Sequence, residues 1–296
     1  MRLALLPVFA TACNQVLGIP EVHTGVCDAD AVFLSAAPVG GIDAGLGVQT
    51  AQLSRDERTI VFSRLTVTGS PDAPVARYGD LYVAHRDLRS DSFGDAVALG
   101  ELNTDSDELG ASLSDDLRTL YFARRDPTRR YQILAAARAG SDDRFIAPVP
   151  VPLGDQTSSI EPFVTANALF FASRRADGAA SLFSAAGRGR SFDKPRQLAS
   201  LELLPSPAAY EDPVVAGNGL TIYFSAPPDN ASPPDIWSAT RTASGQPFGP
   251  PRPVAVLNST SSERPAWISE DSCRLYFVTN RTGRGFELWL ASRATP

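Results

Sequence analysis

The stretch "ERPAWISEDSCRLYFVTNRTGRGFELWLASR", residues 263–293, holds two short apolar runs separated by polar turns. The run "RLYFVT" follows a turn rich in Ser, Glu and Asp, and the run "ELWLASR" follows a turn that contains two glycines. Aromatic and β-branched residues bounded by such turns are typical of neighbouring antiparallel strands. This stretch therefore predicts two consecutive strands, and its pattern recurs along the chain.

The polar turn and the strand after it occur in five copies. The other four read "LSRDERTIVFSR" (53–64), "LSDDLRTLYFAR" (113–124), "VTANALFFASR" (164–174) and "VAGNGLTIYFSA" (215–226). The closing aromatic residues lie at intervals of 60, 49, 53 and 53, at Phe62, Phe122, Phe171, Phe224 and Phe277. A period of about fifty residues indicates an architecture of repeated supersecondary units.

Two further strand-like segments follow the copies. The first of them reads "LYVAHR" (81–86), "ILAAAR" (133–138), "LFSAAGR" (182–188), "IWSATR" (236–241) and "LWLASR" (288–293). The second is richer in proline and occupies residues 92–103, 144–155, 191–202 and 247–258. Proline lacks the backbone donor of a strand ladder, so this second segment suits the outer edge of each unit.

Only four copies of the outer strand follow a third strand, because the chain ends soon after Arg293. The segment "AVFLSAAPVGGID" (31–43) resembles an outer strand and precedes the first repeat, so it can complete the last unit. The sequence therefore predicts an all-β fold, a five-bladed β-propeller of four-stranded antiparallel blades closed by an N-terminal strand. Six blades are the alternative, if the divergent first repeat contains another unit.

The domain organisation follows from these repeats and from the N-terminus. Residues 1–13, "MRLALLPVFATAC", resemble a bacterial lipoprotein signal with Cys13 as the lipidated residue, and an ordinary secretory signal or an apolar start without a signal are the alternatives. Residues 14–30 form a tether and residues 31–296 a single propeller domain. The remaining cysteines, Cys27 and Cys273, either form a disulfide that staples the ring, adding roughly 2–4 kcal/mol, or stay unconnected thiols.

Composition excludes several function classes. A net charge of -6 and a pI near 5.0 argue against binding to nucleic acid. Two histidines and three cysteines are too few for a zinc site, and no glycine-rich phosphate loop occurs, so no cofactor is expected. No other stretch is long and apolar enough to span a membrane, which leaves a lipid anchor as the only membrane contact.

The order of Glu, Pro, Ser-x-Asp, "LYF", an Arg-containing turn and "LW-x-A-x-R" resembles the TolB-type, WD-like β-propeller repeat of bacterial envelope proteins. The resemblance covers residues 49–296 and is clearest at residues 263–293. It implies a monomeric, non-catalytic binding scaffold with a protein partner in the periplasm or at the outer membrane; a secreted protein is the alternative.

Charged residues recur at one rim of the predicted propeller, near its central channel. The acidic ones precede the first strands and the basic ones follow the second strands, at Glu108, Glu161, Glu211 and Glu263 and at Arg64, Arg124, Arg174 and Arg281. They form structural ion pairs or hydrogen bonds within or between the blades, or a polar funnel for a peptide, a glycan or a partner loop. A glycoside hydrolase is the alternative function, and it requires carboxylates that converge in the channel and break the repeat symmetry.

Overall fold

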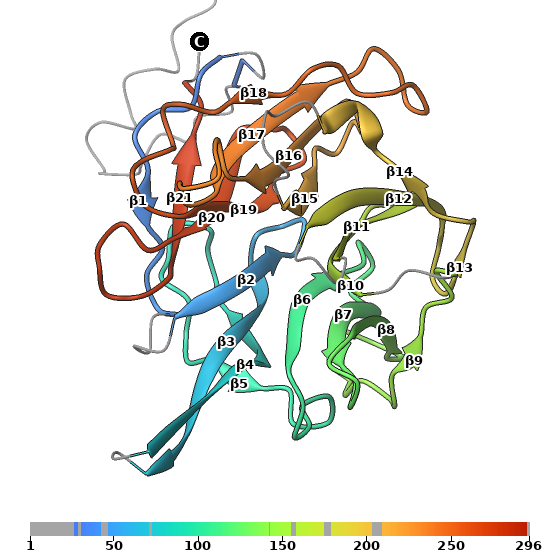
Figure 1. The fold of residues 1–296 in the computed structure, drawn as a ribbon. Helices are drawn as coiled ribbons and strands as arrows, with labels where there is room; N and C mark the ends of the chain where they lie inside the picture. Colours follow the sequence, from blue (N-terminus) through green and yellow to red (C-terminus); the bar gives the residue numbers. More distant parts are fainter. Residues whose placement is uncertain are drawn as a thin grey trace, which may run out of the picture.

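The computed structural model describes residues 27–28, 31–42, 47–70, 73–141, 143–154, 158–174, 179–202 and 209–294. Five antiparallel sheets are arranged as blades around a central channel (Figure 1). The five-bladed prediction is confirmed, and no sixth blade occurs within the described ranges. The proposed lipidation site, Cys13, and the rest of residues 1–26 lie outside the described residues.

The blades follow one another along the chain. Blade 1 holds β2 (Val48–Leu53), β3 (Thr59–Ser70), β4 (Ala73–His85) and β5 (Val97–Ala98), and blade 2 holds β6 (Glu108–Leu113), β7 (Thr119–Arg125), β8 (Tyr131–Ala137) and β9 (Val149–Pro150). Blade 3 holds β10 (Ser159–Val164), β11 (Ala168–Arg174), β12 (Ala180–Arg188), β13 (Ser191–Phe192) and β14 (Arg196–Gln197), followed by a 3₁₀ turn at Ala199–Leu201. Blade 4 holds β15 (Glu211–Val215), β16 (Thr221–Ala226), β17 (Asp235–Thr240) and β18 (Arg252–Pro253), and blade 5 holds β19 (Glu263–Ile268), β20 (Arg274–Thr279), β21 (Glu287–Ser292) and β1 (Ala37–Pro38).

The polar turn between the first two strands of a blade explains why the Ser-x-Asp pattern repeats. In blade 2, Ser114 Oγ donates to Asp116 Oδ1 at 2.6 Å and accepts the backbone N–H of Thr119 at 2.9 Å. The residue after the aspartate, Leu117, has a φ of 59°. The serine and aspartate side chains thus hold the tight turn that brings the second strand back along the first.

The core explains the repeated aromatic and arginine positions. The phenylalanines that close the second strands are fully buried in all five blades, at Phe62, Phe122, Phe171, Phe224 and Phe277. The arginine after the third strand stacks on an aromatic ring before the outer strand, in the pairs Arg86–Phe93, Arg138–Phe145, Arg241–Phe248 and Arg293–Phe33. Phe33 from the N-terminal segment therefore occupies the position in blade 5 that a downstream residue occupies in blades 1, 2 and 4.

The ring closes through the N-terminal strand. β1 pairs with β21 in the register Ala37 to Leu290, and it completes the sheet of blade 5 (Figure 1). Cys27 and Cys273 form a disulfide across 246 residues of sequence. The closure thus combines strand pairing with a covalent bond.

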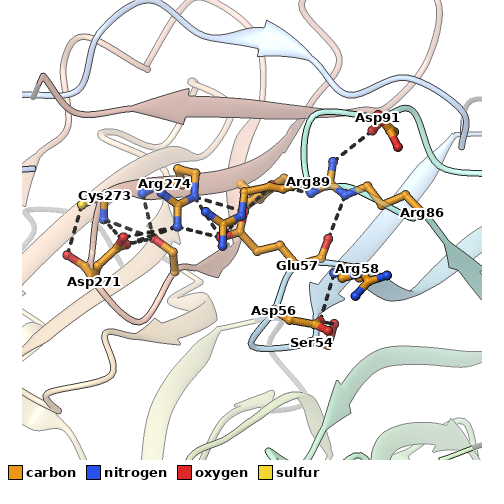
Figure 2. A network of polar contacts seen from close by, with 12 residues as sticks. Ser54, Asp56, Glu57, Arg58, Arg86, Arg89, Asp91, Asp271, Cys273 and Arg274 are labelled. Carbon is orange, nitrogen blue, oxygen red and sulfur yellow. Dashed lines mark hydrogen bonds and ion pairs between the residues drawn. The ribbon is translucent and has the colours of Figure 1, made fainter. Parts of the chain in front are cut away.

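A buried ionic network joins blade 1 to blade 5 beside this closure (Figure 2). The carboxylate of Glu57, whose side chain is 1% exposed, accepts bonds from Arg274 Nε at 2.9 Å and from the Tyr276 hydroxyl at 2.8 Å. Arg89 Nε lies 3.3 Å from the same carboxylate, and Arg86 Nε donates to the Glu57 carbonyl oxygen at 2.8 Å. The two ends of the propeller are therefore connected through one acidic residue.

The connection at residues 65–80, which the sequence marks as longer than in the sister repeats, continues β3 and β4 as an extended hairpin. The hairpin projects from the body of the propeller (Figure 1).

Among the described residues, the structure contains no helix with the length and apolarity to cross a membrane.

Candidate site in the central channel

The channel is narrow in the middle and widens at both ends. Its neck has a volume of only about 20 Å³ and is lined by the first strands, including Gly110, Glu161, Asp212 and Arg264. One end opens into a cavity of about 360 Å³, here named the mouth cavity, which is lined by Gln49, Thr50, Leu109, Tyr131, Ile160, Glu161, Arg174 and Arg264. The opposite end is a separate cavity of about 240 Å³. Both ends carry charged side chains, and the mouth cavity is the end that Glu161, Arg174 and Arg264 line.

Backbone bulges direct two carboxylates toward the neck. The register of β10 against β11 shifts between Ile160 and Phe163, and that of β15 against β16 shifts between Glu211 and Val214. Glu161 and Asp212 occupy these bulges with φ values of 53° and 52°. A bulge changes the direction of one side chain without moving the rest of the strand, and bulges occur often beside active sites.

The same bulge in blade 2 contains a glycine. Gly110 has a φ of 67°, and an added Cβ would lie 2.8 Å from the Cα of Glu161. Glycine adopts this conformation readily, whereas a non-glycine residue there is strained. Blades 3 and 4 thus carry acidic residues at a position whose backbone favours glycine.

The two carboxylates are buried and close together. The Asp212 backbone N–H donates to Glu161 Oε2 at 2.8 Å, and Ser225 Oγ donates to Asp212 Oδ2 at 2.7 Å. Glu161 and Asp212 are 7% and 6% exposed. Such contacts link the two acidic groups across the boundary between blades 3 and 4.

Burial sets the protonation of this pair. It raises the pKa of Glu161 well above its ordinary value, and the charges of Asp212 and Glu211 raise it further. Burial also raises the pKa of Asp212, although the Arg264 guanidinium acts in the opposite direction. Both carboxyl groups therefore hold a proton more readily than they would in water, and Asp212 alone has the Arg264 charge opposing that effect.

Two arginines complete the polar wall. Arg174 Nη2 donates to Glu211 Oε2 at 2.9 Å and Nε donates to Oε1, so this ion pair joins blades 3 and 4. The Arg264 guanidinium stacks on Phe286, and its Nε and Nη2 atoms are buried without a hydrogen-bond partner among the described residues. Arg264 thus offers one edge with two donors beside the acidic pair.

The other predicted rim residues have structural partners within their own blades. Glu108 Oε1 lies 2.7 Å from Arg124 Nε, and Glu263 Oε1 lies 3.1 Å from Arg281 Nη2. Both glutamates are completely buried. Arg64 stacks over Tyr82, and Val48 opposite it supplies no carboxylate. The four glutamates that look equivalent in the sequence therefore have different roles: of these four, Glu161 lines the channel, and Glu211 contacts it through its ion pair with Arg174.

Sequence reasoning missed Asp212 and Arg264. Both lie one residue after a predicted glutamate, and the bulges change which residue of each strand faces the channel. The dipeptides Glu161-Pro162 and Asp212-Pro213 were the available signal, because they place an acid directly before proline in consecutive repeats.

No family model and no curated protein matches this chain. Among solved structures, a GH43_1 enzyme from Xanthomonas citri complexed with xylotriose matches with a TM-score of 0.57 and 15% identity, over 88% of this chain and 89% of that one. The α-L-arabinofuranosidase from Podospora anserina in complex with cellotriose matches with a TM-score of 0.54 and 9% identity, over 92% and 99%. TolB from Acinetobacter baumannii has a TM-score of 0.48 and 14% identity, and this chain spans 55% of its length.

The comparisons and the channel together define the class of the molecule as a five-bladed β-propeller of the architecture found in glycoside hydrolases. The expectation of a non-catalytic, TolB-like scaffold is corrected, because the propellers that match over most of both chains are glycoside hydrolases. The expectation that the protein is not an enzyme is corrected on the same finding. At these identities the likeness shows the fold, so the assignment of catalytic residues depends on the channel itself.

Proposed function

We propose that this protein is a glycoside hydrolase whose active site lies where the mouth cavity, lined by Glu161, meets the neck, lined by Glu161 and Asp212. The observation that carries the proposal is the pair of buried carboxyl groups, Glu161 and Asp212, from adjacent blades at a bulge position where blade 2 has Gly110. This pair breaks the repeat symmetry, whereas Glu108 and Glu263 preserve it through ion pairs within their blades. Two carboxyl groups with different environments are the usual machinery for cleaving a glycosidic bond.

The environments assign the roles. Glu161, whose pKa is raised, holds a proton and donates it to the glycosidic oxygen as the bond to the anomeric carbon breaks. Asp212, beside Arg264, faces the positive charge that develops on the sugar and accepts a proton from the water that adds to the anomeric carbon. The products are a free sugar and an alcohol; Asp212 then releases its proton to solvent and Glu161 takes one up, which restores the starting state.

The walls of the mouth cavity fit a neutral sugar. Its volume of about 360 Å³ lies within the range of small-molecule sites. Tyr131 provides an aromatic ring, and Gln49 and Thr50 provide polar groups for sugar hydroxyls. The two hydrolase structures described above contain xylotriose and cellotriose, so β-linked xylose and glucose oligosaccharides are the first substrates to test.

The test is a hydrolysis assay on xylo- and cello-oligosaccharides and on 4-nitrophenyl β-xyloside, α-arabinofuranoside and β-glucoside. We expect Glu161→Gln to lower kcat/KM by about 10²–10⁴-fold on oligosaccharides. The loss should be smaller on 4-nitrophenyl glycosides, because a nitrophenolate leaves without protonation. The matched control is Asp95→Asn, an exposed aspartate of blade 1. The proposal is wrong if the wild type cleaves none of these substrates, or if Glu161→Gln retains the wild-type rate.

We also propose that the protein works in the bacterial cell envelope, anchored through Cys13. The Cys27–Cys273 disulfide supports an oxidising compartment, since such bonds persist outside the cytosol. Mass spectrometry of the mature protein tests the anchor. A lipidated N-terminal cysteine supports it, and an intact Met1 contradicts it.

A further inference from the structure

A second cavity lies on the flank of the propeller, between blades 1 and 2. In the other four blades, the third residue of the second strand is aromatic: Tyr121, Phe170, Tyr223 and Tyr276. In blade 1 the equivalent residue of β3 is Val61, directly before the core residue Phe62. The repeat therefore lacks one aromatic ring at this boundary.

These aromatic side chains fill the space between each blade and the next. The Tyr276 hydroxyl of blade 5 reaches blade 1, where it accepts a hydrogen bond from Arg86 Nη2 at 3.0 Å. The Tyr223 ring of blade 4 packs edge-on against Phe33, and its hydroxyl accepts a bond from Arg293 Nη2 at 2.8 Å. In both places, a phenol ring occupies the gap and an arginine of the next blade binds its oxygen.

At the boundary between blades 1 and 2 the corresponding space is a groove of about 720 Å³, here named the flank groove. Val61, Val83 and Leu113 are among the apolar residues of its wall. Arg138 and Phe145 also line it and form the same stacked pair as Arg86 with Phe93, with the guanidinium carbon 4.5 Å from the ring centroid. The flank groove thus combines the apolar wall and the arginine that hold a tyrosine side chain elsewhere in the ring.

We propose that the flank groove is a binding site for a small phenolic ligand. The ring would pack on Val61 and Leu113, and its hydroxyl would accept a hydrogen bond from Arg138, as the Tyr223 hydroxyl does from Arg293. Apolar surface inside a protein cavity can bind an aromatic molecule. The flank groove also has polar walls at His85, Glu101 and Asp143, so the ring is placed on its apolar side. This site lies outside the channel and goes beyond the proposed hydrolase activity.

The test uses p-cresol, the side chain of tyrosine, with the full-length protein and its Val61→Tyr and Val61→Ala variants. We expect p-cresol to bind the wild type and Val61→Ala in calorimetry or ligand-observed NMR. Val61→Tyr should place its own ring where the ligand ring would pack, beside Arg138, and lose this binding. Toluene should bind the wild type about tenfold more weakly than p-cresol, because it lacks the oxygen that Arg138 would bind.

Each alternative result has a definite meaning. Absence of p-cresol binding to the wild type at millimolar concentration overturns the proposal, and so does equal binding by Val61→Tyr, because the ligand would then lie elsewhere. Equal binding of toluene and p-cresol overturns the assignment of Arg138. If Val61→Tyr does not fold, Val61→Leu provides a smaller filling side chain, and its binding should be weaker than that of Val61→Ala.

Discussion

Removing the disulfide between Cys27 and Cys273 should strongly destabilise the propeller. The bond closes a loop of 246 residues, and constraining a loop of that length in the unfolded chain corresponds to about 5 kcal/mol at 25 °C. Strain and residual structure in the unfolded chain reduce such values, so we expect a loss of about 3–5 kcal/mol and a fall in Tm on the order of 10 °C.

The assay is urea unfolding followed by tryptophan fluorescence, with and without a thiol reductant. The Cys27→Ser/Cys273→Ser variant is the control: it should unfold at the midpoint of the reduced wild type and should not respond to reductant. If reduction leaves the midpoint of the wild type unchanged, the entropic reasoning is refuted. Strand pairing between β1 and β21 and the Glu57 network would then be sufficient to close the ring.

Three further predictions concern buried groups. The folded state raises the pKa of Glu161, so the wild type should lose stability as pH rises from the ordinary glutamate pKa through the folded value. Glu161→Gln should reduce this loss in urea titrations from pH 4 to 9, and the part that remains comes from Asp212, whose pKa is also raised. Arg274→Met should lower the free energy of unfolding by about 3 kcal/mol, because it removes the closest cationic partner of the buried Glu57 carboxylate. Adding Glu57→Gln to this variant removes the buried charge and should restore part of the lost stability. Gly110→Ala should lower the free energy of unfolding by at least about 1 kcal/mol and reduce hydrolysis, because the new Cβ would press on the Glu161 backbone. Unchanged stability would contradict the φ of 67° at this position.

The repeats made the architecture predictable. The closing aromatics recur because each must fill the same buried place in its blade, and residues 31–43 resemble an outer strand because Phe33 must stack on Arg293. The candidate site was less accessible to sequence reasoning. Side chains of a strand alternate between its two faces, so a bulge of one residue changes which side chain reaches the channel. The sequence shows a glutamate near the start of the first strand in blades 2 to 5, but it does not show that β10 and β15 direct Glu161 and Asp212 into the neck.

The neck of the channel and the flank groove both break the repeat pattern of the blades, but in opposite ways. At the neck, blades 3 and 4 carry acidic residues where the strained backbone of the bulge suits Gly110, so the departure adds a charged group that the fold does not require. At the flank groove, blade 1 carries Val61 where its sisters carry aromatic rings, so the departure removes a group that the packing elsewhere uses. A residue that recurs with the same partner in several blades is explained by the repeat itself, as the pairs Glu108–Arg124 and Glu263–Arg281 of blades 2 and 5 illustrate. In a propeller, the positions that break the pattern at a structural cost are therefore the stronger evidence for function, because stability alone would select against them.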